Sequence, residues 1–123
     1  MYSLNVRDDF IAQHYLTVPD CGPENEWHSH HFTVEIELEG TSLNENGYLT
    51  NIVEVEDALH YLIDRYEDAT LNDLPEFDGL NPSIEHFARI FWTRVQNKIS
   101  SESLDRITVR IWEDESAWAS YSE

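Results

Sequence analysis

Basic residues are scarce in this sequence. Its 123 residues include 7 lysines and arginines against 25 aspartates and glutamates, so the formal net charge at pH 7 is −18. Nucleic acids and anionic membrane surfaces bind proteins through basic patches, so we expect neither as a partner. The excess of acid also opposes the capture of a polyanionic substrate. A high-salt host would also explain the acid-rich composition, because salt screens the repulsion between surface charges.

Cysteine and long apolar runs are scarce too. The single cysteine, Cys21, rules out an internal disulfide framework and fits a reducing compartment. No apolar stretch approaches the length that crosses a bilayer, and the N-terminus lacks the basic and apolar regions of a signal peptide. We therefore expect a cytoplasmic location. A hydrophobic content of 41%, without repeats or linkers, predicts one globular domain over residues 1–123.

Alternating apolar and polar residues predict several strands. Residues 2–14 favour one strand or a bent pair of strands, and residues 30–39 alternate cleanly, as in an antiparallel strand with one solvated face. Residues 48–51 favour a short return strand. Residues 107–112 alternate again and predict the last strand.

Two apolar stripes with helical spacing lie between residue 52 and the last strand. One runs from Val55 to Tyr66, and the other runs from Ile84 to Ile99. Asn81 followed by Pro82 predicts the start of the second helix, with a capping residue and then proline at the first helical position. This order of elements predicts an α+β fold with an antiparallel sheet and both helices on one face. The free edges of such a sheet predict an oligomer.

A group of histidines stands at the start of the second predicted strand. His28 and His30 continue its apolar face, because residues two apart project from the same side of a strand, whereas His31 points to the other side. Two imidazoles with a third from elsewhere can hold zinc and leave one position open. A solvent-exposed, histidine-rich turn is the alternative. Glu113 continues the inner face of the last strand, where an acid costs free energy unless it is paired or bound.

Several short motifs occur in the order in which a known enzyme family has them. They are Phe10-Ile-Ala-Gln-His14, His28-Ser-His-His-Phe32, Gly47-Tyr-Leu-Thr-Asn-Ile52, Leu71-Asn-Asp73, Asn81-Pro-Ser-Ile-Glu85, and Arg110-Ile-Trp-Glu113 followed by Ala117-Trp-Ala-Ser-Tyr121. The chain thereby resembles the 6-pyruvoyl- and 6-carboxytetrahydropterin synthases. The resemblance implies the tunnelling fold, a four-stranded antiparallel sheet with two helices packed on one face. It also implies a homo-oligomer, a trimer or a hexamer.

The resemblance implies a zinc-dependent pterin enzyme. The three zinc-binding histidines of the family fall on His14, His28 and His30, and its pterin-clamping glutamate falls on Glu113. A carboxylate can accept two parallel N–H bonds from the aminopyrimidinone edge of a pterin. The expected substrate is 7,8-dihydroneopterin triphosphate or a less phosphorylated dihydropterin. Its side chain would undergo elimination or retro-aldol cleavage, a lyase reaction of queuosine or folate biosynthesis.

The proton-transfer residues depart from the family pattern. Synthases of this family use a cysteine before the zinc histidines, and here Glu24 occupies that position while Cys21 lies three residues earlier. Some relatives carry glutamate there and cleave the side chain, so Glu24 and Cys21 are both candidates for the base. The family's Asp-His pair falls on Glu67 and Asp68, without a histidine. Either of these acids substitutes, or the protein is a non-catalytic pterin- or purine-binding member. A structural oligomer whose histidines merely hold zinc is a third reading.

Overall fold

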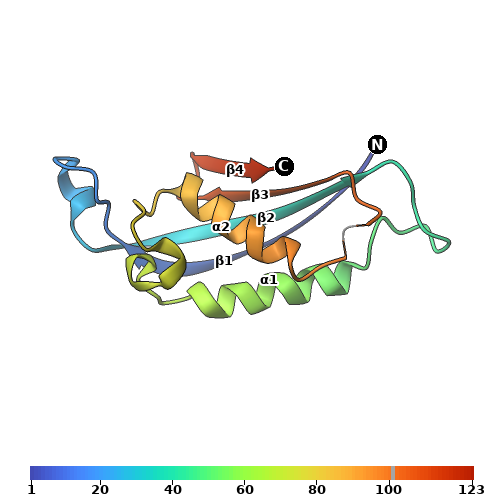
Figure 1. The fold of residues 1–123 in the computed structure, drawn as a ribbon, viewed down its shortest axis with the longest axis horizontal. Coiled ribbons are helices and arrows are strands. Elements are labelled where there is room, and N and C mark those ends of the chain that lie inside the picture. Colours follow the sequence, from blue (N-terminus) through green and yellow to red (C-terminus); the bar gives the residue numbers. More distant parts are fainter. Residues whose placement is uncertain (101) are drawn as a thin grey trace.

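The computed structural model of the chain describes residues 1–100 and 102–123. Figure 1 shows a long antiparallel hairpin that runs the length of the molecule, with two helices across one face of the sheet. The hairpin consists of β1 (Tyr2–His14) and β2 (His28–Gly40). The other elements are α1 (Ile52–Tyr66), α2 (Ile84–Gln96), β3 (Arg106–Trp112) and β4 (Trp118–Ser122). The prediction of a four-stranded antiparallel sheet with two helices on one face is confirmed.

The strands differ in length, and this difference exposes one end of the hairpin. The sheet order is β1-β2-β3-β4, and β1 pairs with β2 from Tyr2 opposite Gly40 to His14 opposite His28. β3 pairs only with residues 33–39 of β2. Residues 28–32 of β2 therefore extend past β3, beside the turn that begins at Glu113.

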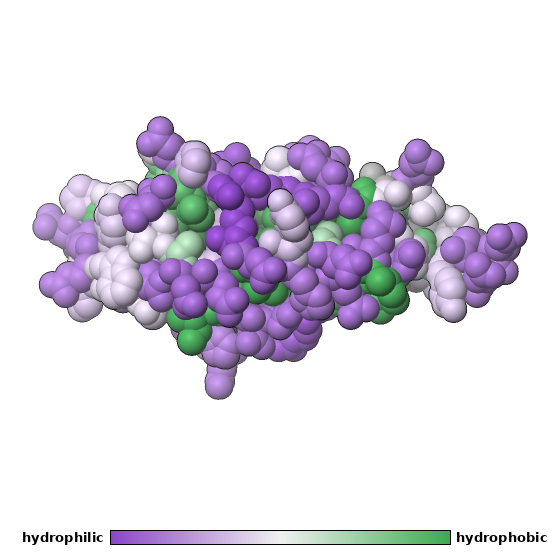
Figure 2. Space-filling view, turned by 90° about the horizontal axis from the view of Figure 1, so that it is seen from below, coloured by the Kyte–Doolittle hydropathy of each residue, from purple (hydrophilic) through white to green (hydrophobic). Residues whose placement is uncertain are grey.

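The core lies between the sheet and the helices. The even-numbered side chains of β2 from Phe32 to Leu38 are fully buried, as the alternation predicts. The Phe87 ring of α2 packs against Phe10 and Phe32, with centroids 6.1 and 5.5 Å apart. Each such aromatic side chain contributes roughly 1.5–3 kcal/mol through burial. Seen from the side of α1, the surface is mostly hydrophilic, with apolar side chains in small separate groups (Figure 2). Within the described residues, neither helix has the length and apolarity needed to span a membrane.

The predicted return strand at residues 48–51 is wrong. The side chain of Asn44 accepts hydrogen bonds from the backbone N–H groups of Asn46 and Tyr48, so local side-chain bonds replace a strand ladder. Asn51 then caps α1, because its side-chain oxygen accepts from the Val53 N–H at 3.0 Å. The fourth strand of the sheet is instead β4, at the C-terminus.

The predicted start of the second helix is also wrong, by two residues. Ser83 is the capping residue of α2, and its hydroxyl accepts from the His86 N–H at 3.2 Å. Asn81 lies outside the helix, where its side-chain oxygen accepts from the Thr17 N–H at 2.8 Å. Pro82 is buried. The residues before α2 are therefore used to contact the segment that follows β1.

An ion-pair network centred on the half-buried Glu76 fixes the connection between the helices. This connection contains two short 3₁₀ turns, η2 (Leu71–Asp73) and η3 (Pro75–Phe77). Glu76 of η3 accepts two hydrogen bonds from Arg65 at 2.7 Å and one from the Tyr66 hydroxyl at 2.8 Å. The bonds from Arg65 lower the pKa of Glu76 from 4.5 to about 2. Arg94 of α2 lies 3.1 Å from the same carboxylate, so the connection is held to both helices.

Candidate functional site

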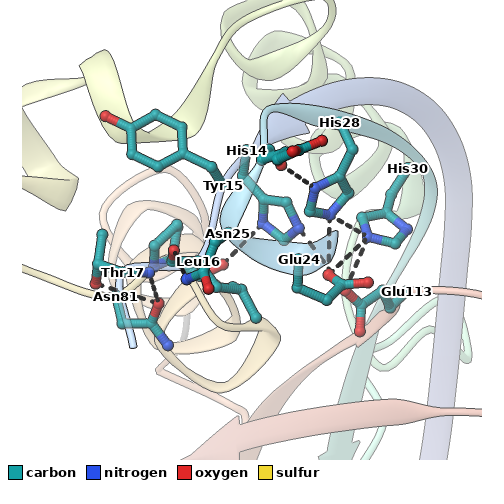
Figure 3. Close-up of polar contacts among 12 residues, drawn as sticks. His14, Tyr15, Leu16, Thr17, Glu24, Asn25, His28, His30, Asn81 and Glu113 are labelled. Carbon is teal, nitrogen blue, oxygen red and sulfur yellow. Dashed lines mark hydrogen bonds and ion pairs between the residues drawn. The ribbon is translucent and has the colours of Figure 1, made fainter. Parts of the chain in front are cut away.

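Three histidines and a glutamate converge at the open end of the hairpin. One ligand atom each from His14, Glu24, His28 and His30 lies within 4.8 Å of all the others. The antiparallel register explains the histidines, since His14 stands opposite His28, and His30 is two residues further along the same face. Figure 3 shows the three rings turned toward one another, with Glu24 and Glu113 beside them.

Backbone carbonyls orient two of the rings. His14 Nδ1 lies 3.0 Å from the Pro82 carbonyl oxygen, and His28 Nδ1 lies 2.7 Å from that of Glu26. A carbonyl oxygen can only accept, so each Nδ1 carries the proton and each Nε2 presents a lone pair. These lone pairs point into the cluster. Carbonyl partners of this kind hold metal-binding histidines in one tautomer.

The inner nitrogens fit a zinc ion. His14 Nε2 is buried and has no hydrogen-bond partner among the described residues. The Nε2 atoms of His28 and His30 face each other at 3.0 Å. A buried nitrogen left without a partner costs free energy, and a bound cation would satisfy all three lone pairs. Three neutral imidazoles form the donor set of a catalytic zinc site with one open position.

His14 is the most enclosed member of the cluster. Its side chain is 1% exposed. Burial, together with smaller contributions from the neighbouring His28 and His30, lowers its pKa from 6.5 to about 4. The ring is therefore neutral near pH 7, which is the form that binds a metal.

We expect the metal-free protein to lose stability as the pH falls from about 6.5 to about 4. In this window the unfolded chain protonates His14 and the folded chain does not. Protonation of His14 therefore leaves the free energy of unfolding unchanged above pH 6.5 and lowers it progressively as the pH falls toward 4. The loss is about 3 kcal/mol, from 1.4 kcal/mol per pKa unit. Urea unfolding of chelator-treated protein at pH 7.5 and 4.5 measures it. Because other groups titrate as well, the decisive quantity is the difference from His14→Gln, which should lack this decline, whereas His31→Gln should retain it. Equal declines in all three proteins would contradict the assignment.

Two carboxylates flank the histidines. Glu24 Oε2 lies 3.0 Å from His28 Nε2, and Glu113 Oε1 lies 3.0 Å from His30 Nε2 and 3.8 Å from His14 Nε2. Burial raises the pKa of Glu113 above its ordinary 4.5. Glu113 directly follows β3, and its side chain lies on the histidine side of the sheet, as the alternation of β3 predicts. Both acids therefore lie within contact distance of the ring nitrogens.

The loop between β1 and β2 determines which residue faces the cluster. Its 3₁₀ turn η1 (Gly22–Asn25) is fastened to the preceding segment, because the Asn25 amide donates to the carbonyls of Leu16 and Val18. The Glu24 carbonyl also accepts from the Leu16 N–H at 2.8 Å. This fold turns the Glu24 side chain toward the histidines. Cys21 is half-buried before the turn, and its sulfur is outside the group of converging ligand atoms.

Glu67 and Asp68 occupy a different position. Both are exposed at the end of α1, and the Asp68 N–H donates to the Ile11 carbonyl of β1 at 2.7 Å. Neither carboxylate belongs to the group of ligand atoms at the histidines. The structure thus brings together His14, His28, His30, Glu24 and Glu113, but not Cys21, Glu67 or Asp68.

Two asparagines hold the segment that follows His14; sequence reasoning assigned no role to Asn72 and predicted a helix cap at Asn81. The Asn72 side chain accepts from the Tyr15 N–H and donates to the Tyr15 carbonyl, at 3.0 and 2.9 Å. Asn81 accepts from the Thr17 N–H, and the next residue supplies the carbonyl that orients His14. Both residues lie in motifs visible in the sequence. Their partners, 57 and 64 residues away, are visible only in the fold.

Comparisons with known proteins agree with this architecture. The family model for 6-pyruvoyl tetrahydropterin synthase matches residues 3–123. A solved 6-pyruvoyl tetrahydropterin synthase of Caenorhabditis elegans is 18% identical, with 99% of this chain and 95% of that one covered and a TM-score of 0.85. The enzyme of Plasmodium vivax, solved with a catalytic glutamate replaced by alanine, is 15% identical over 99% and 97%, with a TM-score of 0.82. An uncharacterised protein of Wolinella succinogenes is 16% identical over 98% and 97%, with a TM-score of 0.76. With its profile matched over nearly the whole length, the chain belongs to the 6-pyruvoyl tetrahydropterin synthase family.

Proposed function

We propose that this protein is a zinc-dependent lyase that acts on the side chain of a dihydropterin, by elimination or retro-aldol cleavage. The observation that carries the proposal is the convergence of three histidine Nε2 atoms with a carboxylate on either side. A site that only stored zinc would not need Glu113, which lies next to the histidines without being needed to complete their set. Family membership supports the same reaction class.

Each residue has a separate task in this proposal. His14, His28 and His30 would hold Zn²⁺, which when bound would polarise the oxygens of the substrate side chain and acidify the adjacent C–H bond. Glu113 accepts two N–H bonds from the aminopyrimidinone ring and orients the substrate. Glu24 takes the proton from the side chain, since its carboxylate faces the same nitrogens from the other side.

The choice of Glu24 as the base has independent support. Its carboxylate is at the cluster, whereas the Cys21 thiol is outside it. The similar Plasmodium vivax enzyme has a catalytic glutamate, so a glutamate can serve in this family. Cys21, Glu67 and Asp68 remain secondary candidates. The last two lie beside the outer strand β1, so in this proposal they act across an interface in a homo-oligomer, a trimer or a hexamer.

Metal content and product analysis test the proposal together. Protein purified without chelator should contain about one zinc per chain. Incubation with 7,8-dihydroneopterin and with its triphosphate, followed by mass spectrometry, should reveal a product with a shortened or dehydrated side chain. A folded protein without zinc would refute the metal site. Zinc and tight pterin binding without any product would favour the non-catalytic alternative. The exposed positions of Glu67 and Asp68 also support that alternative.

A further inference from the structure

We propose that His86 is a positioning residue of the metal centre, because it holds in place the turn whose backbone carbonyl orients His14. The inference rests on the proposed function, in which His14 is a zinc ligand. His86 is half-buried in the first turn of α2, and the proposed chemistry does not use it. Its side chain connects α2 to the residues that precede the helix, and these residues contact His14.

A backbone carbonyl from a distant part of the chain orients His14. The His14 Nδ1 lies 3.0 Å from the Pro82 carbonyl oxygen, although 68 positions separate the two residues in sequence. His14 is buried, and a buried N–H without an acceptor costs about 1–3 kcal/mol. The ring therefore keeps the orientation and the tautomer that point Nε2 into the centre only while the Pro82 carbonyl stays in place.

The direction of the Pro82 carbonyl is set by the turn to which it belongs. This carbonyl and the Ser83 N–H are opposite sides of one planar peptide group. The Ser83 N–H donates to the Asn81 carbonyl oxygen at 2.8 Å, and His86 Nδ1 contacts the same oxygen at 2.7 Å. His86 thereby holds the Asn81 carbonyl in place. The Asn81 carbonyl in turn fixes the peptide plane that presents the Pro82 carbonyl to His14.

The position of His86 in α2 explains why a hydrogen-bond donor is needed there. Ser83 caps α2, so His86 is the third residue of the helix after the cap. Glutamate or glutamine at this position commonly accepts from the N–H of the capping residue. The N–H of Ser83 is already bound to Asn81, so an acceptor would meet a carbonyl instead of a donor. A carbonyl oxygen only accepts, so His86 Nδ1 carries the proton and donates in this bond.

The packed core gives α2 a fixed position. Phe87, the next residue, is fully buried, and its ring centroid lies 5.5 Å from that of Phe32. The Phe32 ring in turn lies 5.9 Å from the His14 ring, measured between centroids. α2 and His14 therefore rest on the same aromatic core, and His86 adds a polar connection between them. Close packing of such a core resists shifts of α2, so His86 stands on a rigid support.

The loop side of the same turn is held separately. The Asn81 side-chain oxygen accepts from the Thr17 N–H at 2.8 Å and from the Thr17 hydroxyl at 3.3 Å (Figure 3). These bonds fasten the loop that carries Glu24, and they leave the Asn81 carbonyl to Ser83 and His86. Loss of the His86 bond would therefore loosen the support of His14 without detaching the loop.

Two amide substitutions separate the hydrogen bond of His86 from its bulk. An asparagine amide nitrogen can take the place of Nδ1, whereas that of glutamine lies near Nε2, so His86→Asn keeps the bond and His86→Gln loses it. We expect His86→Gln to bind zinc about tenfold more weakly, the lower end of the range for outer partners of metal ligands, and His86→Asn to stay within about twofold of the wild type. His60→Gln is the matched control, because His60 pairs with Asp8 on the surface of α1, and it should keep its zinc affinity. Competition with a chromophoric chelator measures all four proteins.

A second readout needs no metal. The Nδ1 proton of His14 is buried and hydrogen-bonded, so in metal-free protein its NMR signal should exchange slowly with water. We expect this signal in the wild type, His86→Asn and His60→Gln, and its loss by rapid exchange in His86→Gln. Wild-type zinc affinity in His86→Gln, or weaker zinc binding with an unchanged His14 signal, would overturn the inference.

The remaining outcomes are also decisive. Equal changes in His86→Gln and His86→Asn, or in His86→Gln and His60→Gln, would mean that the bond to Asn81 does not position His14. Failure of either His86 variant to fold, judged by circular dichroism, would show a role in overall stability and overturn the inference. A wild type that binds no zinc would overturn the proposed function, and the His14 signal alone would then decide whether His86 positions His14.

Discussion

Replacing Glu24 by glutamine is expected to lower kcat by about 10²–10⁴-fold, the usual contribution of a general base. Glutamine keeps the shape of the side chain but cannot take a proton. Because Glu24 Oε2 lies 3.0 Å from His28 Nε2, the same carboxylate is also placed where a fourth zinc ligand would be. The two roles differ in their consequences. Loss of a base lowers kcat while zinc stays bound, whereas loss of a ligand lowers zinc affinity first.

Two neighbouring variants serve as controls for Glu24→Gln. Glu26→Gln alters an exposed acid of the same loop, and because only its backbone carbonyl contacts His28, kcat should change by less than about twofold. Cys21→Ala should also retain activity. The measurements are kcat, zinc content and neopterin binding for each protein. Loss of turnover in Cys21→Ala with normal turnover in Glu24→Gln would transfer the role of base to the thiol.

Strand periodicity predicted which site residues on β2 and at the end of β3 point toward the core, because the position in an alternating run decides which face a side chain occupies. His28, His30 and Glu113 lie on the face that their position in an alternating run indicates. The carboxylate of Glu24 could not be placed in this way, since it belongs to a loop. Its direction depends on the bonds of Asn25 to Leu16 and Val18.

The errors in the predicted fold have two physical origins, asparagine side chains that bind the backbone and weak contrast between the faces of a strand. Residues 48–51 were expected to form a strand, but the backbone N–H and carbonyl of Tyr48 both bind to Asn44 instead. β4 was not expected from its pattern, because Ala119 and Ser120 provide little contrast between its faces. Asn81 was expected to cap a helix and instead binds Thr17. In the two asparagine cases, a side chain that can bind several partners decides the local structure, and the periodic pattern does not show which partner it binds.

Substitution of His30 by alanine is expected to reduce zinc affinity by at least about 100-fold. Structural zinc sites with four ligands contribute about 10–16 kcal/mol, so the share of one ligand is about 2.5–4 kcal/mol, a factor on the order of 100 to 1,000. Competition with a chromophoric chelator measures the affinity without reference to catalysis. Added zinc should raise the melting temperature of the wild type and have little effect on His30→Ala, because only a bound ligand stabilises the folded state.

The adjacent histidine supplies the matched control. His31 lies on the same strand but points to the opposite face, where it pairs with Asp9 at the surface. His31→Ala should keep its zinc affinity and lose no more than about 1 kcal/mol of stability, as expected for an exposed ion pair. Because the two substitutions are chemically identical and one residue apart, any difference in zinc affinity arises from the face that each ring occupies. Equal loss of zinc in both variants would mean that the metal is not bound by the inner face of β2, and the proposed centre of His14, His28 and His30 would then be wrong.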